Sequence, residues 1–162
     1  MQDSLQITHI EYSMNTRSLD VFTIGCNGNC KGCCNPEIKS WDLKGISVTD
    51  TLGKLTELNS KFNKLISRII IVGGDPCDAY IYYPDDVKIL LEKIKTDIKK
   101  PIYFFTRHSI DEVPDDIKNM VDYIKTGAYM PELTTDDNIQ HGIKLATSNQ
   151  IIYKKENKRW KK

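Results

Sequence analysis

Three cysteines near the N-terminus have the spacing of ligands for an iron-sulfur cluster. Cys26, Cys30 and Cys33 follow the pattern C-x₃-C-x₂-C, and small turn-forming residues separate them. Such residues accept positive φ, so the backbone can wrap around a compact object. Clusters with four cysteine ligands have every iron satisfied, whereas three ligands leave one iron free to bind something else. The spacing therefore predicts a [4Fe-4S] cluster with an open iron, which indicates chemistry rather than structure alone.

The same spacing leaves a structural zinc site open as an alternative. Cys34 or Cys77 could supply the fourth thiolate that such a site needs. Zinc ribbons, however, usually present two separated pairs of ligands, and four of the five cysteines here crowd into positions 26–34. This crowding also disfavours disulfides, which need separated partners and an oxidising compartment. The spacing thus favours a cluster over zinc without excluding zinc.

A second segment that could take part in chemistry follows a run of β-branched residues. Gly73, Gly74, Asp75 and Pro76 come directly after the sequence RIIIV. Glycines allow a ligand to approach the backbone, an acidic group suits an ammonium, and proline fixes a turn. Alone this segment is weak evidence, because a turn at a strand end needs such residues anyway.

The remaining periodicity is typical of an α/β domain with a mostly parallel sheet. Strands are expected over 5–12, 19–25, 68–74, 101–106, 121–125 and 150–153. Helices are expected over 49–67, 84–100 and 114–120, with Thr49 or Asp50 as the first N-cap and a turn between Gly74 and Pro84. Right-handed crossovers would curve the strands into a compact, incomplete barrel. Cys26, Gly73 and Thr106 would then share one rim.

The composition mainly excludes classes of partner and of location. The 162 residues fit a single domain, and residues 154–162 are expected as a basic, solvated tail. With 23 Lys and Arg against 22 Asp and Glu, no global field favours nucleic acid or an anionic membrane as partner. No apolar run approaches the roughly 20 residues that span a bilayer, and the N-terminus lacks the pattern of a signal peptide. A cytoplasmic location is expected.

The cysteine spacing after a strand, together with Gly73-Gly74-Asp75-Pro76, resembles the radical S-adenosylmethionine superfamily. Within it, the chain resembles most closely the activating proteins of the anaerobic, class III ribonucleotide reductase, from about residue 10 to residue 152. The likeness includes the cluster-loop segment 31–35, the pair 40–41, the segment 127–133, and 142–150, which ends in Ser-Asn-Gln.

The resemblance implies Cys26, Cys30 and Cys33 as the complete ligand set. It also implies a binding site for S-adenosylmethionine formed by Gly32, Cys33, Cys34, Gly73, Gly74, Asp75 and Thr106. Three positions depart from the family pattern. Cys34 stands where an aromatic residue or histidine is common, Cys77 where an aliphatic residue is usual, and Arg107 where glycine follows the threonine.

The resemblance also implies a mechanism. The reduced cluster cleaves S-adenosylmethionine, and the 5′-deoxyadenosyl radical abstracts hydrogen from a glycine of the large reductase subunit. An electron donor such as flavodoxin is implied as a second partner. No protein acid or base is needed, so His9, His108 and His141 are interpreted as surface or hydrogen-bonded residues. Two alternatives stay open: a small-molecule enzyme similar to 7-carboxy-7-deazaguanine synthase, and a non-enzymatic zinc- or cluster-binding module.

Overall fold

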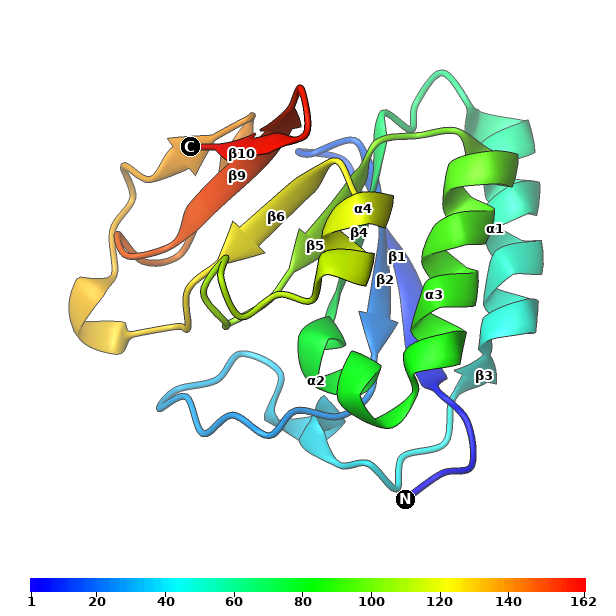
Figure 1. Cartoon of the computed structure of the whole chain (residues 1–162), viewed down its shortest axis with the longest axis horizontal. Coiled ribbons are helices and arrows are strands. Elements are labelled where there is room, and N and C mark those ends of the chain that lie inside the picture. The colour runs from blue at the N-terminus through cyan, green and yellow to red at the C-terminus, as the bar shows by residue number, and fades with distance from the viewer.

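The computed structural model describes all residues, 1–162, and is built on one eight-stranded sheet. The strand order is β10-β9-β6-β5-β4-β2-β1-β3 (Figure 1). Its centre is parallel and consists of β2 (Ser18–Thr23), β4 (Arg68–Gly73), β5 (Ile102–Phe105) and β6 (Tyr123–Thr126). These four strands are neighbours in the sheet and run parallel, so their carboxyl ends lie along one edge. The predicted α/β class and the parallel centre of the sheet are confirmed.

Antiparallel strands extend the sheet on both sides. On one side β1 (Gln6–Ser13) pairs with β2 and with the short β3 (Ile46–Ser47). On the other side β9 (Ile151–Glu156) pairs with β6 and with β10 (Arg159–Lys161). No pairing joins β3 to β10, so the sheet is open and no closed barrel forms.

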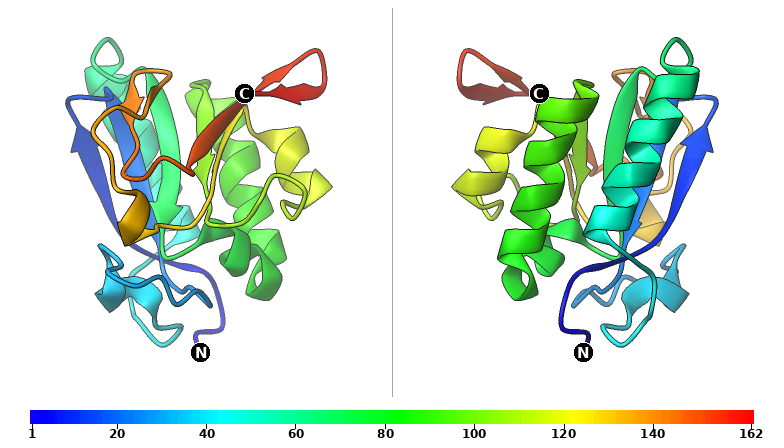
Figure 2. Two further views of the ribbon diagram at one scale, coloured as in Figure 1. Left: turned by 90° about the vertical axis from the view of Figure 1, so that its left-hand side faces the viewer. Right: turned by 90° about the vertical axis from the view of Figure 1, so that its right-hand side faces the viewer.

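The helices α1 (Val48–Phe62), α3 (Pro84–Lys93) and α4 (Asp115–Met120) cover one face of the sheet (Figure 2). A π-helical segment, Ile94–Ile98, continues α3 and ends at Lys99 in the left-handed conformation. The main core lies between these helices and the sheet, and 23 buried side chains form it. Alternate residues of β4 contribute to it, Ile69 and Ile71, while Ile70 faces the other side. The prediction that this strand is buried on both faces is correct.

The opposite face is covered by the chain between β6 and β9. This segment contains the 3₁₀ helix Pro131–Leu133 and the two-stranded pair β7 (Ile139–Gln140) and β8 (Ile143–Lys144). Ile143 and Leu145 pack on Ile70, Tyr103 and Ile152 in a second, smaller core. Asn149 and Gln150 fix the segment by donating side-chain hydrogen bonds to Ala128 O at 2.9 Å and to Gly127 O at 3.5 Å. The Ser-Asn-Gln ending thus has a structural role beside the end of β6.

Four expectations about local structure were wrong in detail. Helix α1 ends at Phe62 rather than near residue 67, and its N-cap is Ser47, whose Oγ accepts the Asp50 N–H at 3.0 Å. The segment expected as a turn after Gly74 is a helix, α2 (Pro76–Tyr82), because Asp75 caps it and proline begins it. The basic end, expected as a solvated tail, forms the hairpin of β9 and β10, where Trp160 packs against the main core.

The other predicted strands and helices are present within two or three residues of their expected ends, as usual for such boundaries. None of the helices is both long enough and apolar enough to pass through a lipid bilayer.

Candidate functional site

The loop that carries the clustered cysteines, residues 24–35, is called the cysteine loop. It begins directly after β2 and has almost no regular structure. Its start is fixed by backbone hydrogen bonds from Gly25 N–H to Ile38 O, 2.8 Å, and from Cys26 N–H to Lys39 O, 3.1 Å. Both acceptors belong to the 3₁₀ helix Pro36–Lys39. The loop is therefore anchored at its first cysteine.

The side chain of Trp41 packs against Gly25, at the start of the cysteine loop. Gly25 has φ +81°, and a Cβ at this position would lie 2.0 Å from the indole ring. The Trp41 Nε1–H donates to Asn27 Oδ1 at 3.1 Å, and the ring packs against Tyr82. Glycine is required before Cys26 because the tryptophan occupies the space of any side chain.

The four clustered cysteines differ in exposure. Cys26, Cys30 and Cys33 are partly buried, and Cys34 is exposed. The Cys33 N–H donates to Cys30 O at 3.2 Å, which closes a turn between the second and third cysteines. Of the three, Cys26 has its thiol in a close group of ligand-type atoms with two other residues, Asp75 and Asp78.

The turn at residues 73–76 lies against the end of β2 and the start of the cysteine loop. The Gly74 N–H donates to Thr23 O at 2.9 Å, and the Asp75 N–H donates to Gly25 O at 2.8 Å. A Cβ on Gly74 would lie 2.0 Å from Gly25 O, so the two strand ends approach closely only because glycine is present. The second glycine of the motif thus has a role in the fold.

The buried carboxylate of Asp75 links the end of β4 to the end of β5 and to the start of α2. Its Oδ1 accepts from the Cys77 N–H at 2.9 Å and from Thr106 Oγ1 at 2.7 Å, and its Oδ2 accepts from the Arg107 N–H at 2.9 Å. Burial raises the pKa of the Asp75 carboxyl, and the hydrogen bonds from Arg107 and Thr106 oppose that rise. Cys26, Gly73 and Thr106 therefore share one rim, as the parallel topology predicts.

Asp78 is a member of the site that sequence reasoning missed. Its carboxylate accepts from the Asn27 N–H at 2.8 Å and from Arg107 Nη2 at 3.0 Å, and it lies 2.8 Å from His108 Nε2. His108 is thus a hydrogen-bonded residue, as expected. The i, i+3 spacing of the two aspartates would have identified Asp78, but only with α2 recognised as a helix.

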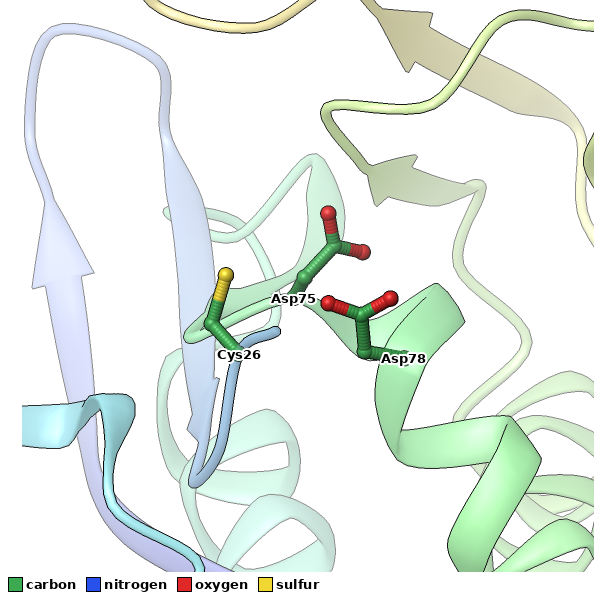
Figure 3. Close-up of side chains that lie close together, drawn as sticks. All are labelled: Cys26, Asp75 and Asp78. Atoms are coloured by element: carbon green, nitrogen blue, oxygen red, sulfur yellow. The ribbon is translucent and has the colours of Figure 1, made fainter. Parts of the chain in front are cut away.

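Cys26, Asp75 and Asp78 converge on a common space (Figure 3). Their ligand-type atoms all lie within 4.8 Å of one another. Burial raises the pKa of the Cys26 thiol, and the two carboxylates raise it further. The Gly28 N–H, which donates to Cys26 Sγ at 3.2 Å, and the Arg107 guanidinium lower it. Positive groups near the thiol are therefore needed to favour its thiolate.

Lys125 is the second residue that sequence reasoning missed. It lies on β6, is only 9% exposed, and donates from Nζ to Gly127 O at 2.8 Å. Burial lowers its pKa to about 8, while Asp75, Cys30 and Cys34 act in the opposite direction. A lysine within a short strand that is expected to be buried is the signal that could have identified it.

The loop cysteines, rather than Cys77, fit the ligands of a 4Fe-4S cluster. Cys77 is buried in the main core, and burial raises the pKa of its thiol to about 12, so it stays protonated and is a poor fourth ligand. An open cavity of about 450 Å³ lies beside the loop, between residues 28–31 and residues 128–132. Gly32 lies near its edge, where a Cβ would meet Tyr129 at 3.4 Å. The Nε of Arg107, which also lines this cavity, is buried without a hydrogen-bond partner.

The chain matches a known protein family over most of its length. The family model described as "4Fe-4S single cluster domain" matches residues 16–153. No curated protein matches the chain. The matched residues contain the cysteine loop, the turn at residues 73–76 and every parallel strand.

Proposed function

The chain belongs to the family of 4Fe-4S single cluster domains, and we propose that it is a radical S-adenosylmethionine enzyme that generates the glycyl radical of an anaerobic ribonucleotide reductase. One observation carries this proposal. The turn at residues 73–76, which is chemically suited to an ammonium group, is hydrogen-bonded to Gly25, the residue before Cys26. A cofactor held by this turn would therefore border the first cysteine of the cluster loop.

In this proposal Cys26, Cys30 and Cys33 hold the cluster, and Cys34 is a neighbour that lines the cofactor site. The buried, protonated thiol of Cys77 supports a set of three ligands rather than four. When bound, the cluster and S-adenosylmethionine supply a one-electron cleavage that yields methionine and a 5′-deoxyadenosyl radical. The protein supplies ligation, orientation and shielding.

The proposed cofactor site uses groups on the rim that the strand ends form. Asp75 already accepts three internal hydrogen bonds, so its role is to fix the turn and to add negative potential near the ammonium. The backbone carbonyls of Gly73 and Gly74 would accept hydrogen bonds from the ammonium group. Thr106 holds Asp75 in place. The buried cation of Lys125, on the adjacent strand, is suited to the carboxylate end of the methionine.

The proposed protein substrate would enter the cavity beside the cluster loop. This cavity is bordered by the loop on one side and by the segment from Ala128 to Glu132 on the other. An extended glycine-containing loop of the reductase would fit it, because glycine has no side chain to hold the backbone away. A one-electron donor such as flavodoxin would reduce the cluster. Since reduced thiols are required, we place the protein in the cytoplasm.

The test is anaerobic reconstitution with iron and sulfide, followed by reduction in the presence of S-adenosylmethionine. The expected result is four irons per chain and release of 5′-deoxyadenosine. Cys30→Ala should lose both, whereas Cys34→Ser, an exposed neighbour in the same loop, should keep the four irons. Cleavage that persists in Cys30→Ala would contradict the ligand assignment.

Co-incubation with an anaerobic reductase tests the substrate. The expected result is the doublet of a glycyl radical in the electron paramagnetic resonance spectrum of the reductase. Cofactor cleavage without this doublet, with every candidate reductase, would overturn the activase proposal in favour of a small-molecule substrate. One zinc and no iron after anaerobic purification would overturn the enzyme proposal in favour of a structural module.

A further inference from the structure

Arg107 occupies a central position in the site, although no step proposed above uses its side chain. It follows Thr106 at the end of β5, and its Nη2 donates to both oxygens of Asp78, at 3.0 and 3.1 Å. Its Nε lies 3.6 Å from Asp75 Oδ2, which is too long for a hydrogen bond. The Nε is buried and has no hydrogen-bond partner. The Nε therefore lies beside the cluster loop without a hydrogen bond to either aspartate.

The guanidinium also lies against the first cysteine. A Cβ on Gly28 would be 2.6 Å from both Cδ and Nε of Arg107, and 3.2 Å from Cys26 Sγ. Arginine and thiol thus lie around the same small space, which glycine leaves free. The positive charge of Arg107 thus lies beside the same thiol that the carboxylates of Asp75 and Asp78 approach.

The two aspartates create a field that opposes reduction of a cluster at this place. Their carboxylate oxygens lie within 4.8 Å of Cys26 Sγ, and both side chains are at least 98% buried. Reduction adds one negative charge to a cluster that already carries thiolates. Nearby charges and hydrogen bonds to sulfur are the main factors by which a protein sets the potential of such a cluster.

We infer that Arg107 raises the reduction potential of the cluster by offsetting the charges of Asp75 and Asp78 next to the ligand Cys26. The inference rests on the proposed ligand set and deepens it. The redox step is the transfer of one electron from an external one-electron donor to the cluster, from the 2+ to the 1+ state. No bond to Arg107 forms or breaks, and the guanidinium keeps its proton throughout.

The experiment measures the midpoint potential of the reconstituted cluster in the full-length protein, by anaerobic redox titration followed by electron paramagnetic resonance. Arg107→Gln removes the charge and keeps a polar side chain. At a fixed ambient potential, the ratio of reduced to oxidised cluster should fall at least tenfold, which corresponds to about 59 mV for a one-electron couple. His108→Gln is the matched control, because it changes the other partner of Asp78 and keeps a donor. Its potential should equal that of the wild type.

Two outcomes would overturn the inference. One is a wild-type potential in Arg107→Gln protein that carries four irons. The other is an equal fall in His108→Gln, which would attribute the effect to disturbance of Asp78. If Arg107→Gln binds no cluster, Gly28→Ala decides, because its methyl group displaces the guanidinium and leaves every charge in the protein. An unchanged potential in that variant would also refute the inference.

A further variant separates failure of the inference from failure of the ligand set. Cys26→Ala should lose the cluster. If it retains four irons, the proposed ligand set is wrong. If it loses them while Arg107→Gln keeps the wild-type potential, only the role of Arg107 is refuted.

Discussion

Alanine at position 74 would place a methyl group inside the backbone of the neighbouring strand end. Its Cβ would lie 2.0 Å from Gly25 O and 2.5 Å from the carbonyl carbon, whereas ordinary contact begins at 3.4 Å. Backbone atoms cannot rotate away as a flexible side chain can, so the ends of β2 and β4 must separate. The separation breaks the hydrogen bonds from Gly74 to Thr23 and from Asp75 to Gly25.

The size of the effect follows from these contacts. Overpacking a well-packed site typically costs about 1–3 kcal/mol. Each of the two broken hydrogen bonds contributes about 0.5–1.5 kcal/mol. We therefore expect Gly74→Ala to lower the free energy of unfolding by about 2–6 kcal/mol, a large share of the stability of a typical domain. Because Gly25 precedes Cys26, the variant should also bind less iron.

The assay is urea denaturation of the apo-protein, with iron analysis after reconstitution. Gly53→Ala is the matched control, since Gly53 lies exposed within α1 and a Cβ there would meet nothing within 4 Å. Helix propensity predicts that this variant is more stable than the wild type by about 0.5–1 kcal/mol. The same chemical change should thus have opposite signs at the two positions. Wild-type stability and iron content in Gly74→Ala would refute the argument from close approach.

Three further predictions concern stability and ligation. The unfolded chain keeps the proton of Lys125 up to about pH 10.5, whereas the folded protein releases it near pH 8. The free energy of unfolding of wild-type apo-protein should therefore rise by up to about 3 kcal/mol between these two pH values. Lys125→Met should be more stable at pH 7 and lack that gain in a urea series over pH, and an unchanged pH profile would contradict this. Ser47→Ala should cost about 1 kcal/mol in thermal or urea unfolding because it removes the N-cap of α1, while Thr49→Ala should change stability by less than about 0.5 kcal/mol. Cys77→Ala should keep four irons per chain after reconstitution, because its buried thiol is not a ligand, and loss of iron from a folded variant would show otherwise.

The parallel centre of the sheet could be predicted from the sequence because its signals are local. The run that contains Ile69, Ile70 and Ile71 is β-branched and apolar, which indicates a strand buried on both faces. Pro84 and the two aspartates after it mark the start of α3, and the helix begins there. Helix α2 was missed because its start uses Asp75 as a cap, in a segment that also fits a turn.

The position of the candidate site was also predictable, since carboxyl ends of neighbouring parallel strands must lie along one edge. Cys26, Gly73 and Thr106 each end or follow a strand, so their proximity follows from the order of the strands. The roles of Asp78, Arg107 and Lys125 were not predictable in this way. Asp78 and Arg107 contact each other from separate segments, and the burial of Lys125 depends on the elements that pack around β6.

The sequence by itself therefore determined the cysteine spacing, the strand runs and the edge at which the cysteine loop begins, because these depend on residues close together in the chain. Only the tertiary structure decided which charges surround Cys26, because the two aspartates at the start of α2 meet Arg107 and Cys26 only when β2, β4 and β5 pair. It likewise turned the basic end into a hairpin, since β9 gains its hydrogen bonds from β6 and Trp160 gains its contacts from the main core. Long-range pairing and burial, rather than local propensity, set the electrostatics of this site.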